Sequence, residues 1–115
     1  MPRNARQLSV TIDRPADEAY AFLAVPENFR RWASGMGADV RFSEPNAHGV
    51  LDHSVRTPEG REVYVPLRVL PRGRQCELVL TLFRQPQMTD ERFAADSEWV
   101  MRDLLAAKRI LEERT

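Results

Sequence analysis

The side chains best suited to acid–base, nucleophilic or metal chemistry in this 115-residue sequence are two histidines and one cysteine. His53 alternates with Leu51 and Val55, so on a strand it shares their core-facing side. Burial lowers an imidazole pKa, and a neutral ring can orient a ligand or move a proton. The simpler reading is a core histidine with one hydrogen bond. His53 is therefore the one candidate catalytic residue, as general acid or base.

Metal binding is not expected from the sequence. The only plausible ligands are His48, Asp52, His53 and Cys76, and the two histidines are five residues apart, which places them on opposite faces of a straight strand. Cys76 lies on an apolar face with no base near it in sequence, so it is read as a small core residue. Phosphate-binding glycine loops and dinucleotide motifs are lacking, and we expect no cofactor.

A second polar pair, Tyr64 and Arg68, occupies the opposite face of its strand, with Pro66 between. On a solvated face these are surface residues. Pro66 removes a ladder donor, which indicates a bulge or a sheet edge. Such a bulge would turn Arg68 inward as an anchor for an anion.

Hydrophobic periodicity predicts the elements that position these side chains. Alternation of apolar and polar residues, with turn residues between the runs, predicts an antiparallel meander of about five strands at residues 8–13, 40–44, 50–56, 61–70 and 75–83. Two short helices meet at Pro26, the first beginning at Pro15 and the second ending at Gly35 and Gly37.

A long C-terminal helix is predicted over residues 90–113. Thr89 can cap it, and apolar side chains recur at spacings of three and four, including Phe93, Val100, Met101, Leu104, Leu105 and Leu111. About 24 residues at about 1.5 Å each span about 36 Å, the width of a small sheet. We expect the sheet to lie against this helix.

The other side of that helix carries Trp99 with Ala95, Ala106 and Ile110. An aromatic and an aliphatic side chain there indicate a second contact surface, interpreted as a homodimer interface. The alternative is a loop that covers Trp99.

Composition limits the classes of partner. Lys+Arg and Asp+Glu both number 17, so no net charge attracts nucleic acid or an anionic membrane. One cysteine, no signal-like apolar core and no run of 18 apolar residues are typical of a cytoplasmic protein. The length predicts a single domain, residues 1–115.

Two stretches resemble the START-like or SRPBCC superfamily, in particular its polyketide cyclase/dehydrase branch. In residues 12–32 a strand leads into a helix begun by Pro15, and a Pro26-Glu27-Asn28 turn leads to Trp32; residues 82–93 and 103–112 resemble the last strand and closing helix. The family usually has seven strands, so five imply a narrower sheet. Because the family has no universal catalytic set, Pro15, Pro26 and Trp32 transfer as structural markers only.

The resemblance implies an α+β helix-grip fold, with an apolar cavity between a curved antiparallel sheet and the C-terminal helix. The predicted function is binding of a small hydrophobic or aromatic ligand, lipid-like molecules included. The predicted lining residues are Phe22, Trp32, Leu51, His53, Val65, Leu67, Leu80, Phe93, Val100, Met101 and Leu104. The alternatives are a cyclase or dehydratase that uses His53, and a protein with a filled cavity that self-associates through the Trp99 face.

Overall fold

The structure is a computed structural model that describes residues 4–33, 40–57 and 60–114. In chain order its elements are β1 Ala5–Ile12, α1 Ala16–Leu23, α2 Pro26–Trp32, β2 Val40–Phe42, β3 His53–Arg56, β4 Glu62–Val65, β5 Leu67–Arg72, β6 Gln75–Phe83 and α3 Asp90–Glu113. The mixed α+β class, the two short helices and the long terminal helix are as predicted. The glycines expected to end α2 lie outside the described residues.

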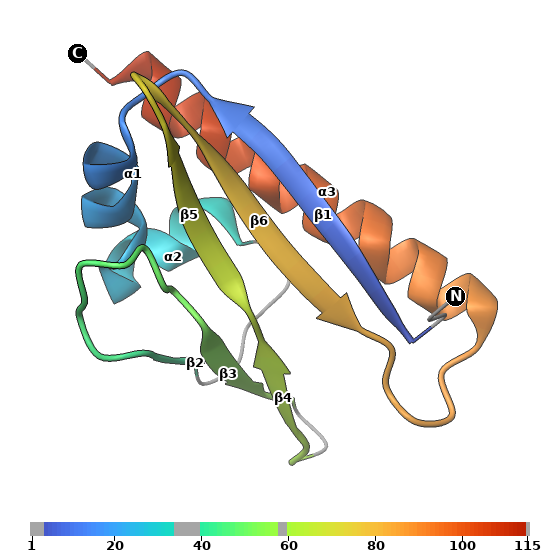
Figure 1. Ribbon diagram of the computed structural model, residues 1–115. Helices are drawn as coiled ribbons and strands as arrows, with labels where there is room; N and C mark the ends of the chain where they lie inside the picture. Colours follow the sequence, from blue (N-terminus) through green and yellow to red (C-terminus); the bar gives the residue numbers. More distant parts are fainter. Residues whose placement is uncertain (1–3, 34–39, 58–59, 115) are drawn as a thin grey trace.

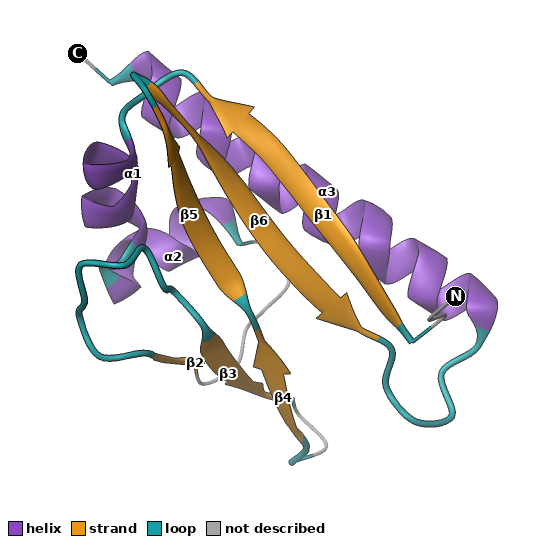
Figure 2. Ribbon diagram, viewed as in Figure 1, coloured by secondary structure: helices purple, strands orange, loops and turns teal. Residues whose placement is uncertain are grey.

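The described part of the chain has six strands rather than about five. They form two antiparallel sheets, in the orders β1-β6-β5 and β2-β3-β4. Figure 2 shows the first as three long neighbouring strands and the second as three short ones. The additional strand arises because the predicted strand over residues 61–70 is divided at Pro66 into β4 and β5.

The two sheets are continuous in register across this division. His53 in β3 pairs with Val65 in β4. Three residues earlier on one side and three later on the other, Val50 forms a bridge with Arg68, so the antiparallel register is unchanged. The Leu51 N–H donates to the Leu67 carbonyl at 2.7 Å. Residues 49–51 therefore lie along β5 and continue into β3, which preserves the predicted meander.

Pro66 interrupts the hydrogen-bond ladder between β4 and β5. It has no N–H to donate, although its carbonyl accepts from the Thr81 N–H in β6 at 3.0 Å. The next N–H, that of Leu67, donates to the Asp52 carboxylate at 2.9 Å instead of to a backbone carbonyl. Pro66 thus lies inside the connected strands, not at a sheet edge.

Helix α3 runs beside β1 along one side of the molecule, and α1 and α2 lie toward the other side (Figure 1). It begins as predicted, with the Thr89 hydroxyl accepting from the Arg92 N–H at 3.1 Å. Near its end, Lys108 Nζ donates to the Thr11 carbonyl at 2.8 Å, and Arg14 donates to the Glu112 and Arg114 carbonyls. The two bonds from Arg14 satisfy carbonyls at the negative end of the helix dipole, and the Lys108 bond ties α3 to β1.

Two expectations for the apolar faces need correction. Leu105, placed by spacing in the buried stripe of α3, is 47% exposed because it lies about 100° around the helix from the buried Leu104. The strand β5 packs against α1, whereas α3 packs mainly on β1 and α2. The sheet therefore rests on α1 as well as on α3, and α2 packs against both of these helices.

Candidate ligand site between the sheet and the helices

A small cavity lies where α2, β3, β4, β6 and α3 meet. Its volume is about 40 Å³, and it is lined by Phe29, Trp32, Ala33, His53, Val65, Leu80, Leu82, Val100 and Asp103. One water needs about 10–15 Å³ of such space, so the cavity holds about three. The lining is mostly aromatic and aliphatic, with three residues that carry polar groups.

The structure brings together five of the eleven predicted lining residues at this cavity, namely Trp32, His53, Val65, Leu80 and Val100. The others belong to the surrounding core. Leu51, Leu67 and Leu104 are buried and Met101 is half-buried.

The two remaining predicted lining residues, both phenylalanines, lie beneath arginines. Phe22 lies beneath Arg31 and Arg114, and Phe93 beneath Arg6 and Arg84, with each guanidinium carbon 5.0 to 5.8 Å from the ring centroid.

Four lining residues were not predicted. Phe29 has a recognisable signal, because it precedes Trp32 by three positions on one side of α2. Asp103 is a carboxylate that precedes the core residue Leu104 and is itself buried. A buried charged side chain within an apolar stripe is rare without a partner or a function, and that was the available signal.

The ring of His53 has a defined tautomer. Its Nδ1 lies 3.0 Å from the Leu51 carbonyl oxygen. Because a carbonyl can only accept, Nδ1 carries the proton, and Nε2 of the neutral ring is an acceptor. Burial lowers the pKa of His53, and this outweighs the Leu51 carbonyl and the Asp52 charge, which raise it. The ring is neutral at pH 7, as expected from its core-facing position.

Aromatic side chains fix the orientation of this imidazole. The ring centroid of Phe42 lies 5.1 Å from that of His53, and Phe29 lies 5.6 Å away in an edge arrangement. Phe29 also meets Trp32 edge-on at 5.0 Å. Such contacts each contribute about 0.5–1.5 kcal/mol beyond burial, so this end of the cavity is rigid and aromatic.

Trp32 leaves one polar group unsatisfied. The side chain is buried, and its indole Nε1–H has no hydrogen-bond partner among the described residues. An unpaired buried donor costs about 1–3 kcal/mol. A molecule that supplied an acceptor to this N–H would recover that free energy on binding.

A second polar cluster lies on the other face of the strand and is centred on Asp52. Its Oδ1 accepts from the Leu67 N–H and from Arg68 Nε, both at 2.9 Å, and its Oδ2 accepts from Arg68 Nη2 at 2.8 Å and the Tyr64 hydroxyl at 2.6 Å. The paired guanidinium is the main reason that the pKa of Asp52 lies far below its ordinary value. Arg68 is bound by a carboxylate of its own chain instead of facing an anion.

The two other candidate residues, Cys76 and His48, lie in surroundings that do not favour chemistry. Cys76 is buried, and burial raises the pKa of its thiol, which disfavours the nucleophilic thiolate. The backbone N–H of His48 donates to the Asn46 side chain in a turn. Among the residues described, no group of three or more His, Cys, Asp and Glu side chains could hold a metal ion.

No protein-family model and no curated protein matches this sequence. Solved structures do. DynU16, a protein of the dynemicin biosynthetic locus, has a TM-score of 0.75 and 14% identity over 97% of this chain and 48% of its own. The AHSA1-like protein RHE_CH02687 from Rhizobium etli has a TM-score of 0.69 and 20% identity, over 99% of this chain and 86% of its own.

The Zhui aromatase/cyclase from Streptomyces sp. R1128 gives a TM-score of 0.59 at 16% identity, over 96% of this chain and 94% of its own. The chain thus spans about half the length of DynU16 but nearly all of the other two. In the described part of the chain, no helix has both the length and the apolar character needed to cross a membrane. These likenesses agree with the resemblance read from the sequence and show that the chain has the helix-grip fold.

Proposed function

We propose that the protein binds a small aromatic molecule in the cavity between the sheet, α2 and α3. The observation that carries this proposal is the combination of an apolar, aromatic lining with two polar groups of opposite kind. His53 Nε2 is an acceptor, and Trp32 Nε1–H is a donor with no acceptor among the residues that the structure describes. Sites of this composition, mostly apolar with a few placed polar groups, are typical of small-molecule binding.

The size of the cavity sets a condition on binding. A cavity of about 150 Å³ accommodates benzene, several times the present volume of about 40 Å³. A ring therefore enters only if lining side chains change rotamer. Leu82 and Val100 are half-buried and can do so more readily than the fully buried Leu80.

The two polar groups indicate the chemistry of the ligand. A hydroxyl group can donate to His53 Nε2 while its oxygen accepts from Trp32 Nε1. A ring that carries such a hydroxyl, as in a phenol or an aromatic enol, satisfies both requirements with one substituent. A purely hydrocarbon ligand would leave both groups unpaired.

The test is uptake of phenol-type molecules, measured by ligand-observed NMR on the purified protein. Val100→Trp places an indole in the cavity and is expected to abolish uptake. Ala95→Trp adds the same side chain at an exposed position of the same helix and is the matched control. Unchanged uptake by Val100→Trp would show that binding occurs elsewhere or not at all.

A second candidate is a cyclase or dehydratase in which His53 acts as general acid or base. The favouring observation is that two titratable side chains, His53 and Asp103, line the same cavity from opposite elements. The likeness to an aromatase/cyclase is consistent with it. Turnover of a polyketide-like substrate that is lost in His53→Gln while the substrate still binds would establish this candidate over the binder.

A third candidate is self-association of a cytoplasmic protein whose cavity stays filled. The small void favours it, and Trp99 is 47% exposed on α3. The Arg102 guanidinium lies 5.4 Å from the Trp99 ring centroid, and Ala106 and Ile110 beside it are half-buried. Loss of a dimer in Trp99→Glu would support this face as the interface.

A further inference from the structure

We propose that a second copy of this chain docks on a different surface, formed by the open edge of β1 and the adjoining side of α3. The two copies are related by a twofold axis, with β1 antiparallel to its counterpart. The two β1-β6-β5 sheets then form one continuous sheet. Three independent features of the described residues lead to this proposal.

The first feature is an unprotected strand edge. β1 is the outermost strand of its sheet and pairs only with β6. The Asn4 carbonyl accepts from Arg84 N–H across that pair, and the Thr11 carbonyl points the other way, to Lys108. By alternation, the backbone groups of Gln7 and Ser9 also point away from β6.

The central part of this edge, residues 7–10, has no residue that blocks further pairing, whereas Arg6 lies nearer its start. The central residues Gln7, Leu8, Ser9 and Val10 include no charge and no proline. Native edge strands normally carry such features, or a bulge or a cover, to prevent association. Residues 7–10 lack a charge and a proline, and the bond from Lys108 of α3 to an outward-pointing group of β1, the Thr11 carbonyl, lies beyond them. This indicates that the central part of the edge is occupied when the protein is assembled.

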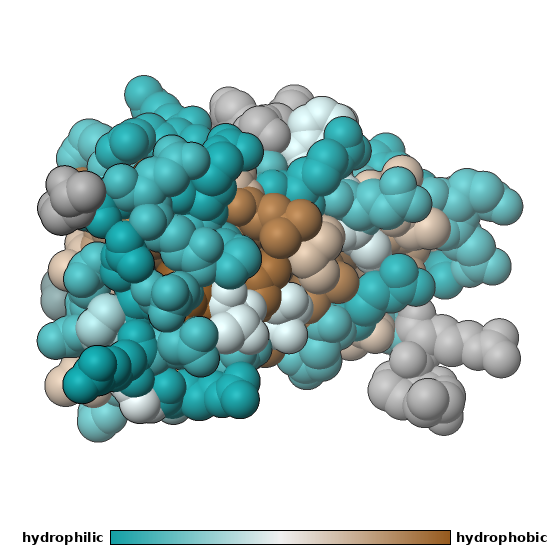
Figure 3. Space-filling view, turned by 90° about the horizontal axis from the view of Figure 1, so that it is seen from above, coloured by the Kyte–Doolittle hydropathy of each residue, from teal (hydrophilic) through white to brown (hydrophobic). Residues whose placement is uncertain are grey.

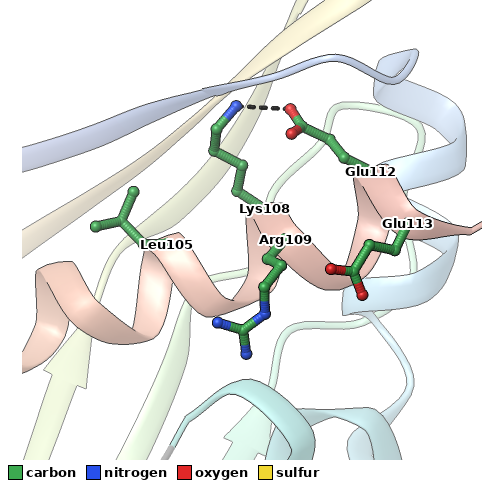
Figure 4. A pocket seen from close by; sticks show the side chains of 5 residues that line it. All are labelled: Leu105, Lys108, Arg109, Glu112 and Glu113. Atoms are coloured by element: carbon green, nitrogen blue, oxygen red, sulfur yellow. Dashed lines mark hydrogen bonds and ion pairs between the residues drawn. The ribbon is translucent and has the colours of Figure 1, made fainter.

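The second feature is an exposed apolar area beside this edge. Figure 3 looks onto the upper side of the molecule in Figure 1, along which α3 and β1 lie, and shows a hydrophobic patch between hydrophilic regions. Leu105 is 47% exposed and Met101, on the same side of α3, is half-buried. Leu105 also borders an open groove of about 240 Å³ together with Lys108, Arg109, Glu112 and Glu113 (Figure 4).

The third feature is a change of charge along residues 91–109 of α3. On the side that includes Leu105, the first half of the helix carries Glu91 and Glu98, and the second half carries Arg102 and Arg109. All four are exposed, and none forms an ion pair with another described residue. The last turn of α3 adds Glu112 and Glu113, so the helix is not basic to its end. Within residues 91–109, acidic side chains before residue 100 and basic side chains after it are complementary to an antiparallel copy of the same segment.

The strand pairing and the helix charges are satisfied by the same twofold axis. β1 and α3 run in the same direction, since Arg6 lies over Phe93 and Lys108 meets Thr11. The midpoint of β1, near Leu8, therefore lies beside residue 100 or 101 of α3.

An axis at that point places Glu91 opposite Arg109 of the second copy, because both residues are nine positions from residue 100. Glu98 and Arg102 are both two positions from residue 100, so they also face each other across the axis. One axis thus satisfies the strand pairing and the helix charges, which is the condition for an isologous dimer.

The test is the oligomeric state by size-exclusion chromatography with light scattering over a concentration series. The wild type is expected to dimerise. Arg109→Glu is expected to weaken the dimer by on the order of tenfold or more, because it places like charges opposite each other. The double variant Glu91→Arg with Arg109→Glu exchanges the two charges and is expected to restore wild-type affinity.

Two further variants separate the surfaces. Ser9→Pro blocks an N–H that points away from β6, so it is expected to abolish the dimer while the fold, checked by circular dichroism, is kept. Leu70→Glu introduces a carboxylate at a side chain of β5 that is 48% exposed and lies away from β1 and α3, and it is expected to leave the dimer intact. A monomeric wild type, or a dimer that Leu70→Glu dissolves and the charge exchange does not restore, would overturn the proposal.

Discussion

Asp52 and His53 are neighbours in sequence, yet they occupy environments that differ in one decisive respect. The Asp52 carboxylate accepts four hydrogen bonds on one face of the strand, whereas His53 makes one hydrogen bond and faces the cavity on the other. A fully satisfied buried group stabilises a fold, and a partly satisfied one retains capacity for a ligand. The contrast assigns stability to the first face and binding to the second.

The largest effect on stability is expected from removing the Asp52 carboxylate. Asp52→Ala leaves the Leu67 N–H without its acceptor and a guanidinium without its partner. Because Arg68 is half exposed to solvent, we expect a loss of about 2 kcal/mol in the free energy of unfolding, and not the larger loss of a fully buried pair. Urea denaturation measures it. A loss as small as that of His53→Ala would contradict the assignment.

The contributions of Asp52 and His53 to stability should also be lost at different pH values. The pKa of His53 is lowered from 6.5, so the stability that depends on its neutral form is complete above pH 6.5 and declines as the pH falls below it. The pKa of Asp52 is lowered from 3.8, so its contribution is complete above pH 3.8 and is lost only below it. Thermal denaturation between pH 2 and pH 8 is expected to show an upper decline and the beginning of a lower one. His53→Gln should remove the upper decline alone. Asp52→Asn should make the lower decline smaller without removing it, because the pKa of Glu112 is also lowered, by its hydrogen bond with Lys108.

The smallest expected effect tests whether the Trp32 indole N–H contributes to ligand binding. Trp32→Phe removes the unpaired indole N–H, which stabilises the fold, and also removes buried ring atoms, which destabilises it. Because these two effects oppose each other, the free energy of unfolding is expected to change little. Affinity for phenol is expected to fall about fivefold, the value of one hydrogen bond of about 1 kcal/mol, while affinity for toluene stays the same. NMR titration with the two ligands measures this. Equal effects on both would mean that the indole N–H does not contact the hydroxyl.

Local patterns were sufficient to predict most of the fold. The cap at Thr89 and the spacing of apolar residues locate α3, and alternation places His53 toward the core. Each of these features depends on residues close together in sequence. The division at Pro66 was anticipated as an irregularity, but its form depends on the side chain of Asp52, 14 positions earlier.

The site was predicted less completely, for a physical reason. Alternation assigns a side chain to a face but gives neither its partner nor the space left around it. Arg68 was read as a surface residue or an anion anchor because its bond to Asp52 joins two segments across the sheet. The cavity volume depends on how tightly Leu82, Val100 and other side chains pack, which periodicity does not report.

The pairing of β1 with β6 has a consequence for how the chain folds. Ala5 pairs with Phe83, and Ile12 pairs with Cys76. β1 therefore has no strand partner until β6 has been synthesised. During synthesis, β1 leaves the ribosome with its apolar residues uncovered until more than half of the chain has followed. We therefore expect slow, late closure of the sheet, and a period of vulnerability to misassembly that ends only when the last strand arrives.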